Sequence, residues 1–258
     1  MAVSWIYYFQ YASATLFGAD ISRQPLQVII LVSLLIAGAF LIGIIYELNK
    51  NYKKSESIES LLFLIGMITL IPALIFGIVS GLCYSLLGLP DLGIMLQIIG
   101  MFPIQFTYMC VNLFAIRMTF PKRYKLVLVI LLLLSAGTIG AQLWAIAQGP
   151  PHFDIINFGV IYSPEVQIVR FTTLIIIAAI PISVFYYYAA KVREENRPRS
   201  NLSIWLGTGI LCFVIAFQIT TIITLFRIMQ LFYIPASIIF YVCFAMPEWF
   251  KNRIGWTE

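Results

Sequence analysis

The residues of this chain that could recognise a polar molecule are amides and hydroxyls set inside apolar sequence. The clearest set lies in LQIIGMFPIQFTYMCVN, residues 96 to 112. At about 100° per residue of an α-helix, Gln97, Met101, Gln105, Tyr108 and Asn112 project into one arc roughly 80° wide. An unpaired amide in hydrocarbon is costly, so this face must meet other helices or a cavity. The pattern predicts hydrogen bonding inside a helical bundle.

Other apolar segments carry similar polar faces. These are Ser135, Thr138 and Gln142 in one segment, Tyr233, Ser237 and Tyr241 in another, and Arg170 with Thr173 in a third. The segment around residue 220 has two polar faces, with Gln218 and Thr221 opposing Thr220, Thr224 and Arg227. We expect the Ser135 and Tyr233 faces to meet the polar face of residues 97 to 112.

The composition indicates an integral membrane protein of the all-α class. Of the 258 residues, 61% are hydrophobic and 10% charged, against roughly 45–50% and about 25% in soluble domains. Seven apolar stretches are long enough to cross a bilayer as helices. They cover residues 26–46, 60–83, 92–118, 126–147, 167–189, 202–226 and 229–246. The prediction is a single seven-helix domain over residues 1–258, whose bundle spans 26–246.

The two ends of the chain are expected to lie at membrane surfaces. Residues 1–24 are rich in aromatic side chains and lack the basic start and small-residue cleavage site of a signal peptide. We predict an interfacial segment there. Residues 247–258 mix Trp249, Phe250, Ile254 and Trp256 with basic residues, and are predicted to form a juxtamembrane cytoplasmic tail along the inner surface.

Basic residues predict the orientation in the membrane. One set of alternate loops and helix ends holds thirteen of them: Lys50, Lys53, Lys54, Arg117, Lys122, Arg123, Lys125, Lys191, Arg193, Arg197, Arg199, Lys251 and Arg253. The other set holds Arg23, Arg170 and Arg227. Short loops rich in Lys and Arg mark the cytoplasmic side, so the N-terminus is expected outside and the C-terminus inside, in a plasma (cytoplasmic) membrane. This asymmetry explains the net charge of +5 without a nucleic-acid partner.

With this orientation, most polar side chains of the spans fall in the outer half of the bundle. The expected ligand-binding residues are Gln97, Gln105, Gln142, Arg170, Gln218, Thr221, Arg227 and Tyr233. Two guanidinium groups above amides would suit an anionic or carboxylate-bearing molecule, unless Asp91, Asp154 or Glu165 neutralises them. Interhelical hydrogen bonding is the alternative, at roughly 0.6 kcal/mol per pair.

The longest connection, QGPPHFDIINFGVIYSPEV, holds the only histidine, His152. It is expected to form either a lid or a rigid surface cap. Prolines inside four spans, Pro72, Pro103, Pro181 and Pro235, each free a backbone carbonyl that another group must satisfy. The small-residue pairs Gly77/Gly81 and Ala136/Gly140 predict close helix packing.

Catalysis and cofactors are not expected. The four cysteines fall inside spans without metal-ligand spacing, and we interpret them as small buried apolar residues. EENRPR at 194–199 fits the Glu-Glu-x-x-x-Arg signature of intramembrane prenyl-protein proteases, but it lies in a basic loop without the further histidine and asparagine that such sites need. No other enzyme motif is present, and no metal site is predicted.

In plan the chain resembles rhodopsins and G-protein-coupled receptors, although no motif supports membership of either. A retinal protein needs a lysine in the seventh helix, and MQLFYIPASIIFYVCFAMP has none. The leading hypothesis is a seven-helix receptor or sensor that binds a small molecule in an outward-facing polar pocket and signals through a separate cytoplasmic protein. A small-molecule transporter and a structural or assembly subunit of a larger membrane complex are the alternatives.

Overall fold

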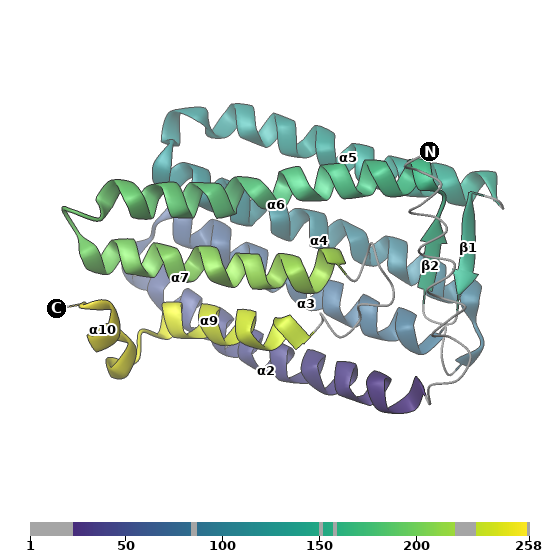
Figure 1. Ribbon diagram of the computed structural model, residues 1–258, viewed down its shortest axis with the longest axis horizontal. Helices are drawn as coiled ribbons and strands as arrows, with labels where there is room; N and C mark the ends of the chain where they lie inside the picture. The colour runs from purple at the N-terminus through teal and green to yellow at the C-terminus, as the bar shows by residue number, and fades with distance from the viewer. Residues whose placement is uncertain (1–22, 84–86, 150–151, 157–158, 220–230, 257–258) are drawn as a thin grey trace.

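The structure, a computed structural model, describes residues 23–83, 87–149, 152–156, 159–219 and 231–256, and most of them belong to long helices (Figure 1). The helices are α2 (Arg23–Ser55), α3 (Ile58–Leu82), α4 (Pro90–Thr119), α5 (Tyr124–Gln148), α6 (Pro164–Val192), α7 (Arg197–Val214), α9 (Tyr233–Ala245) and α10 (Glu248–Ile254). A 3₁₀ turn (Pro121–Arg123) precedes α5, and a π-helical turn (Ile215–Ile219) follows α7. The connection from α5 to α6 contains an antiparallel hairpin of β1 (Phe153–Ile156) and β2 (Gly159–Tyr162).

Six of the described helices, α2 to α7, are long and apolar enough to cross a membrane. The pair α9 and α10 raises this number to seven if the two helices, bent by 90° relative to each other, form one span. The 13 residues of α9 rise only about 20 Å, less than the roughly 30 Å of a hydrocarbon core. The expected spans 202–226 and 229–246 each contain residues outside the described part. Most of the expected N-terminal interfacial segment also lies outside it.

Local sequence explains where helices begin and end. The first helix is longer than the expected 26–46 because ELNKNYKKS continues it to Ser55, with Leu48 buried in the core and two lysines in the last turn, where the helix dipole favours them. Glu56, at φ 49°, ends this helix. The hydroxyl of Ser57 then caps α3 by accepting a hydrogen bond from the Ser60 amide at 3.1 Å.

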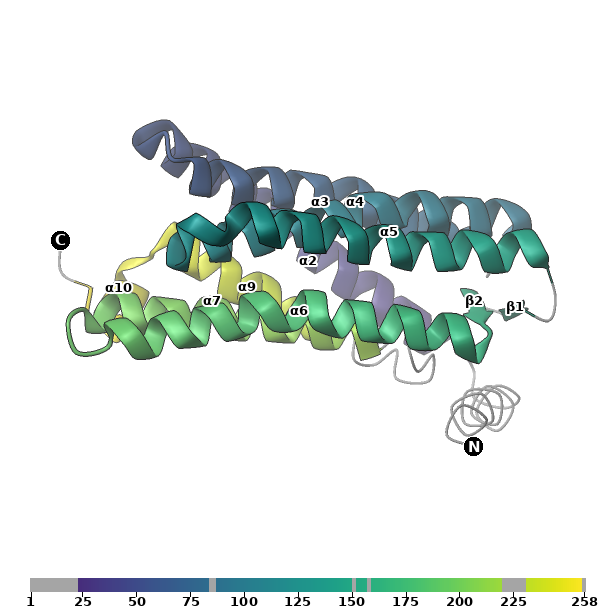
Figure 2. The ribbon, with the colours of Figure 1, turned by 90° about the horizontal axis from the view of Figure 1, so that it is seen from above.

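The helices form a closed ring. Each of α2 to α6 packs on the next helix in the chain, and α7 packs on α9. Contact between α9 and α2 closes the ring, and α4 also packs on α6. Figure 2 shows α3, α4 and α5 on one side of the bundle and α6, α7 and α9 on the other. Because α4 contacts three neighbours, its side chains can meet other helices over much of its surface.

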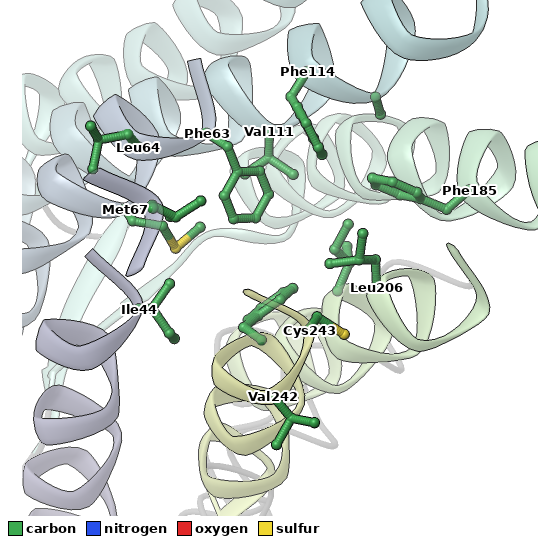
Figure 3. Close-up of a cluster of buried hydrophobic side chains, with 14 of the residues drawn as sticks. Ile44, Phe63, Leu64, Met67, Val111, Phe114, Phe185, Leu206, Val242 and Cys243 are labelled. Carbon is green, nitrogen blue, oxygen red and sulfur yellow. The ribbon is translucent and has the colours of Figure 1, made fainter. Parts of the chain in front are cut away.

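A hydrophobic cluster of aliphatic and aromatic side chains forms the largest part of the core (Figure 3), and it includes Phe250 and Ile254 of α10. The ring centroid of Phe63 lies 4.8 Å from that of Phe114 and 6.1 Å from that of Phe240, and Phe114 lies 5.9 Å from Phe185. Dispersion between such closely packed side chains stabilises a bundle in lipid, where burial from water no longer drives association. The core around these rings is therefore mainly apolar.

The C-terminal segment folds back onto the bundle. Phe250 and Ile254 on α10 are fully buried, whereas Trp249 is 60% exposed. Phe250 packs edge-on against Trp205 of α7 at 5.6 Å, and the Asn201 amide donates to the Ile254 carbonyl at 3.2 Å. The predicted interfacial tail is thus a short amphipathic helix with one face docked on protein.

Close packing at small residues occurs, but at other positions than expected. A Cβ added to Gly77 or Gly140 would meet no atom within 4 Å, and Gly77, Ala136 and Gly140 are exposed, so the close packing predicted for Gly77 of the Gly77/Gly81 pair and for Ala136/Gly140 is wrong for the described part of the bundle. Those faces point outward. Instead, a Cβ at Gly66 of α3 would lie 3.0 Å from the Cβ of Cys110 on α4.

This difference predicts opposite effects of two matched substitutions. Gly66→Leu should force α3 and α4 apart and lower stability by about 1–3 kcal/mol, the usual cost of overpacking. Gly77→Leu should leave stability unchanged or raise it by up to about 1 kcal/mol through helix propensity. The thermal unfolding midpoint in detergent measures both, and equal losses for the two variants would contradict the observed α3–α4 packing.

Candidate functional site

The polar face predicted on residues 97 to 112 lies on α4 and faces other helices. Gln105, Tyr108 and Asn112 are all buried, with exposed fractions of 4% or less, and Gln97 is half-buried nearer the start of the helix. The second predicted face, on α5, is also buried at Ser135, Thr138 and Gln142. The prediction that these faces turn away from lipid is confirmed.

Buried polar side chains lie between α4, α5 and α6, and most of them form hydrogen bonds from one helix to another. We call this set the polar seam: Gln105, Asn112, Ser135, Thr138, Gln142, Arg170 and Thr173. The Ser135 hydroxyl donates to the Gln105 side-chain carbonyl at 3.2 Å. The hydroxyls of Thr138 and Thr173 share a hydrogen bond of 2.5 Å. Gln142 donates to the Thr138 carbonyl within its own helix at 3.1 Å. The seam therefore holds α5 against α4 and α6.

Asn112 of the polar seam compensates for a hydrogen bond that Pro181 removes from α6. Pro181 in α6 has no N–H to donate to the carbonyl of Ile177, four residues earlier. The side-chain amide of Asn112 on α4 donates to that carbonyl at 3.0 Å, and also to the Tyr108 carbonyl at 2.8 Å. Asn112 is 0% exposed. An amide from the neighbouring helix thus satisfies the group that the proline frees, as the sequence requires.

Next to the seam, at about the middle of the helices, lies a central cavity of about 50 Å³. Six helices line it, with one contact from each given by Ala37, Leu74, Tyr108, Pro181, Phe213 and Tyr233. The lining is mostly apolar, and the buried hydroxyl of Tyr108 has no hydrogen-bond partner within the part of the chain that the structure describes. A water needs about 10–15 Å³, so the cavity has room for roughly three to five waters or a very small molecule.

Three of the four intrahelical prolines and the π-helical turn surround this central cavity. Pro181 lines it directly, Leu70 and Leu74 flank Pro72, and Ala236 follows Pro235. Phe213 lines it just before the π-helical turn and lies 6.1 Å from the ring of Tyr108. Prolines kink helices, and π-helical turns are frequent at functional sites. Part of the wall is thus built at or beside positions where regular helical hydrogen bonding is interrupted.

The connection between α5 and α6 is a cap packed on the bundle. Val160 and Tyr162 of β2 are buried among Ile94, Ala145 and Val166 of three helices. His152 packs edge-on against Trp144 at 4.8 Å, and its carbonyl accepts from the Ser163 amide at 2.8 Å. Sequence reasoning missed the hairpin, although the β-branched and aromatic residues around Asn-Phe-Gly were a signal for one.

Those expected ligand-binding residues that the structure describes do not come together in one site. Gln105, Gln142 and Arg170 belong to the polar seam, whereas Tyr233 lines the central cavity. The Gln218 side chain, Thr221 and Arg227 lie outside the described part. Sequence reasoning placed Tyr108 on the correct face but not among the ligand-binding residues, and it missed Ala37, Phe213 and Ala236 because apolar residues of a span give no sign of lining a cavity.

The remaining chemistry-bearing residues are scattered. Within the described residues, no three His, Cys, Asp or Glu side chains gather as metal ligands. Cys83, Cys110 and Cys243 are buried and Cys212 is half-buried, all as free thiols. Glu194, Glu195 and Arg199 are exposed near the connection from α6 to α7. No family model, curated protein or solved structure matches the chain.

The role of Asn112 is testable by a double-mutant cycle. Pro181→Ala restores an N–H for the Ile177 carbonyl, so the side chain of Asn112 becomes dispensable there. We expect Asn112→Leu to cost about 1 kcal/mol more in the wild-type background than in the Pro181→Ala background. Unfolding free energies in detergent or bicelles measure the four proteins. An equal cost in both backgrounds would mean that the Asn112–Ile177 bond contributes nothing.

Proposed function

We propose that the chain is a seven-helix receptor or sensor that binds a small, mainly apolar molecule in the central cavity and passes a conformational change to a separate protein. The observation that carries this proposal is the cavity itself, with a mostly apolar wall and a buried Tyr108 hydroxyl that has no hydrogen-bond partner among the described residues. A mostly apolar lining with a few polar groups is the usual lining of a small-molecule site. A ligand with one hydrogen-bonding group fits it.

The small volume of the central cavity supports coupling between binding and movement. At about 50 Å³ it is smaller than the roughly 150 Å³ cavity that accepts benzene. A ligand of more than a few heavy atoms must therefore separate the helices. Pro181 removes a helical hydrogen bond from α6 and Pro235 lies in α9, and we expect these two helices to yield there. Their displacement would reach the ends of the bundle, where the partner is proposed to bind.

The proposal includes the orientation with the N-terminus outside, the C-terminus in the cytoplasm and a seventh span ending in α9. Its basis is the excess of basic residues at the end that holds α10. Most described cations there, such as Lys122, Arg123 and Arg253, are exposed and form no ion pair within the described residues. They suit the phosphate-rich inner surface of a membrane.

Cysteine labelling tests the orientation. Glu165 and Glu195 are exposed residues near the opposite ends of α6. An impermeant maleimide applied to intact cells should label Glu165→Cys, and should label Glu195→Cys only after lysis. The unmodified chain is the control, since its described cysteines are buried or half-buried. The reverse labelling would refute the orientation, and labelling of both in intact cells would refute α6 as a span.

Filling the central cavity tests the ligand proposal. Ala236→Leu places three more heavy atoms in the cavity, whereas Ala136→Leu makes the same change on the exposed face of α5. Native mass spectrometry of protein from its own membrane should show a small-molecule adduct on the wild type and on Ala136→Leu. We expect at least about a tenfold lower occupancy on Ala236→Leu. An unchanged adduct on Ala236→Leu, or none on the wild type, would contradict the proposal.

A transporter is the second candidate, because the central cavity lies about midway along kinked helices, where alternating access places its substrate. Uptake of the adduct molecule into proteoliposomes by the wild type, and not by Ala236→Leu, would favour it. The bonded polar seam favours a third candidate, an assembly subunit with a dry interior. Co-purification with another protein at fixed stoichiometry, without an adduct, would support that one.

A further inference from the structure

Arg170 is a buried cation whose hydrogen bonding is incomplete. Its side chain lies on α6 beneath the hairpin and is 4% exposed. The guanidinium carbon lies 4.8 Å from the centroid of the Tyr162 ring. One terminal nitrogen donates to the Gln167 side-chain carbonyl over a long 3.4 Å, and the buried Nε has no hydrogen-bond partner among the side chains that the structure describes. A cation–π contact and one weak bond are little compensation for removing this charge from water.

The described side chains also leave the charge of Arg170 unbalanced. No carboxylate among them lies within 4.0 Å of its guanidinium. Arg117, at the other end of the bundle, shows the usual arrangement, with Nε 3.0 Å from a Glu59 carboxylate oxygen. Asp91 and Glu165 lie at the same end as Arg170, but both are exposed and unpaired with it. An arginine does not lose its proton in proteins, so the charge needs an anion.

Tyr162 does not supply that negative charge. Burial raises the pKa of the Tyr162 hydroxyl above its ordinary value, and the nearby Arg170 only partly opposes the shift. The phenol is therefore neutral at physiological pH. Its ring covers the guanidinium without balancing it.

The surroundings of Arg170 favour an anion. The guanidinium reaches toward the start of its own helix, as the bond to Gln167 and the stacking on Tyr162 show. The first turn of a 29-residue helix lies there, at the positive end of its dipole, and Ser163 provides no side-chain cap. Val160 and Tyr162 of the hairpin exclude water from this corner.

We propose that Arg170, the first turn of α6 and the Tyr162 ring form a binding site for a carboxylate. The planar fork of a guanidinium matches the two oxygens of a carboxylate, and Nε–H is available as one of the two donors. The hairpin is the cover of this site. The site is separate from the central cavity and does not depend on the function proposed for that cavity.

An internal counter-ion is the competing explanation, and Asp154 on β1 is the residue to test. Asp154 stands opposite Ile161 in the register of the hairpin, and the neighbouring pair is Phe153 with Tyr162. If Asp154 neutralises Arg170, its removal should destabilise the protein and open the site to an added anion. If an external carboxylate does so, its removal should leave binding unchanged.

The test is the thermal unfolding midpoint of the purified full-length chain, titrated with sodium acetate and, separately, with sodium chloride. Acetate at a hundredfold excess over its Kd should raise the wild-type midpoint by about 5–10 °C. The rise should be absent in Arg170→Gln, which also controls for general salt effects. Arg170→Lys keeps the positive charge but lacks the planar guanidinium, so acetate should raise its unfolding midpoint by less than that of the wild type. This variant replaces Arg170→Gln in the test if the glutamine variant does not fold. Asp154→Asn should behave as the wild type.

Three results would overturn the proposal. The first is a wild-type midpoint that acetate moves no further than it moves that of Arg170→Gln. The second is a rise that appears only in Asp154→Asn, because Asp154 would then be the native counter-ion. The third is a rise with chloride and none with acetate, because the site would then take a halide and not a carboxylate.

Discussion

Within a hydrocarbon layer, every backbone N–H and C=O group must find its partner inside the protein, and this constraint governs the bundle. Pro181 has no N–H, so the Ile177 carbonyl lacks its helical donor. The side-chain amide of Asn112, on the neighbouring helix α4, donates to that carbonyl at 3.0 Å. Because that bond needs α4 close to α6, it fixes the two helices together at mid-height. The seam on one side and the cavity on the other both depend on this placement.

The two sides differ in how they can respond. In the seam, Gln105 with Ser135 and Thr138 with Thr173 bind α5 to its neighbours through directional bonds, so movement there would break them. In the wall of the central cavity the Thr107 hydroxyl donates to the Gly66 carbonyl at 3.1 Å, but most of the other contacts are apolar and non-directional, and the rings of Phe213 and Tyr233 meet edge-on at 5.6 Å. Such contacts repack at lower cost. The bundle therefore has directional hydrogen bonds on one side and mainly apolar contacts on the other.

Helical periodicity predicted the buried faces well because hydrogen bonding in lipid leaves little choice. Polar groups at Gln105, Asn112 and Thr138 had to turn inward, and they do. The small-residue rule failed because it depends on which faces meet. Gly66 packs against Cys110, whereas Gly77 in the same helix faces outward, and nothing in the local spacing distinguishes them. The hairpin was missed because its strands lie in a short connection where proline and glycine suggested a loop.

The sequence by itself determined a helical membrane protein, the approximate limits of its described spans, the inward direction of its polar faces and the need to repair each proline break. These follow from composition, helix geometry and the cost of unpaired polar groups, all of which act locally. Only the tertiary structure decided that Asn112 serves Pro181, that Tyr108 reaches a cavity and that Arg170 lies beneath Tyr162. Those pairings join residues distant in the chain, and the relative rotation and height of packed helices, which no single segment encodes, select them.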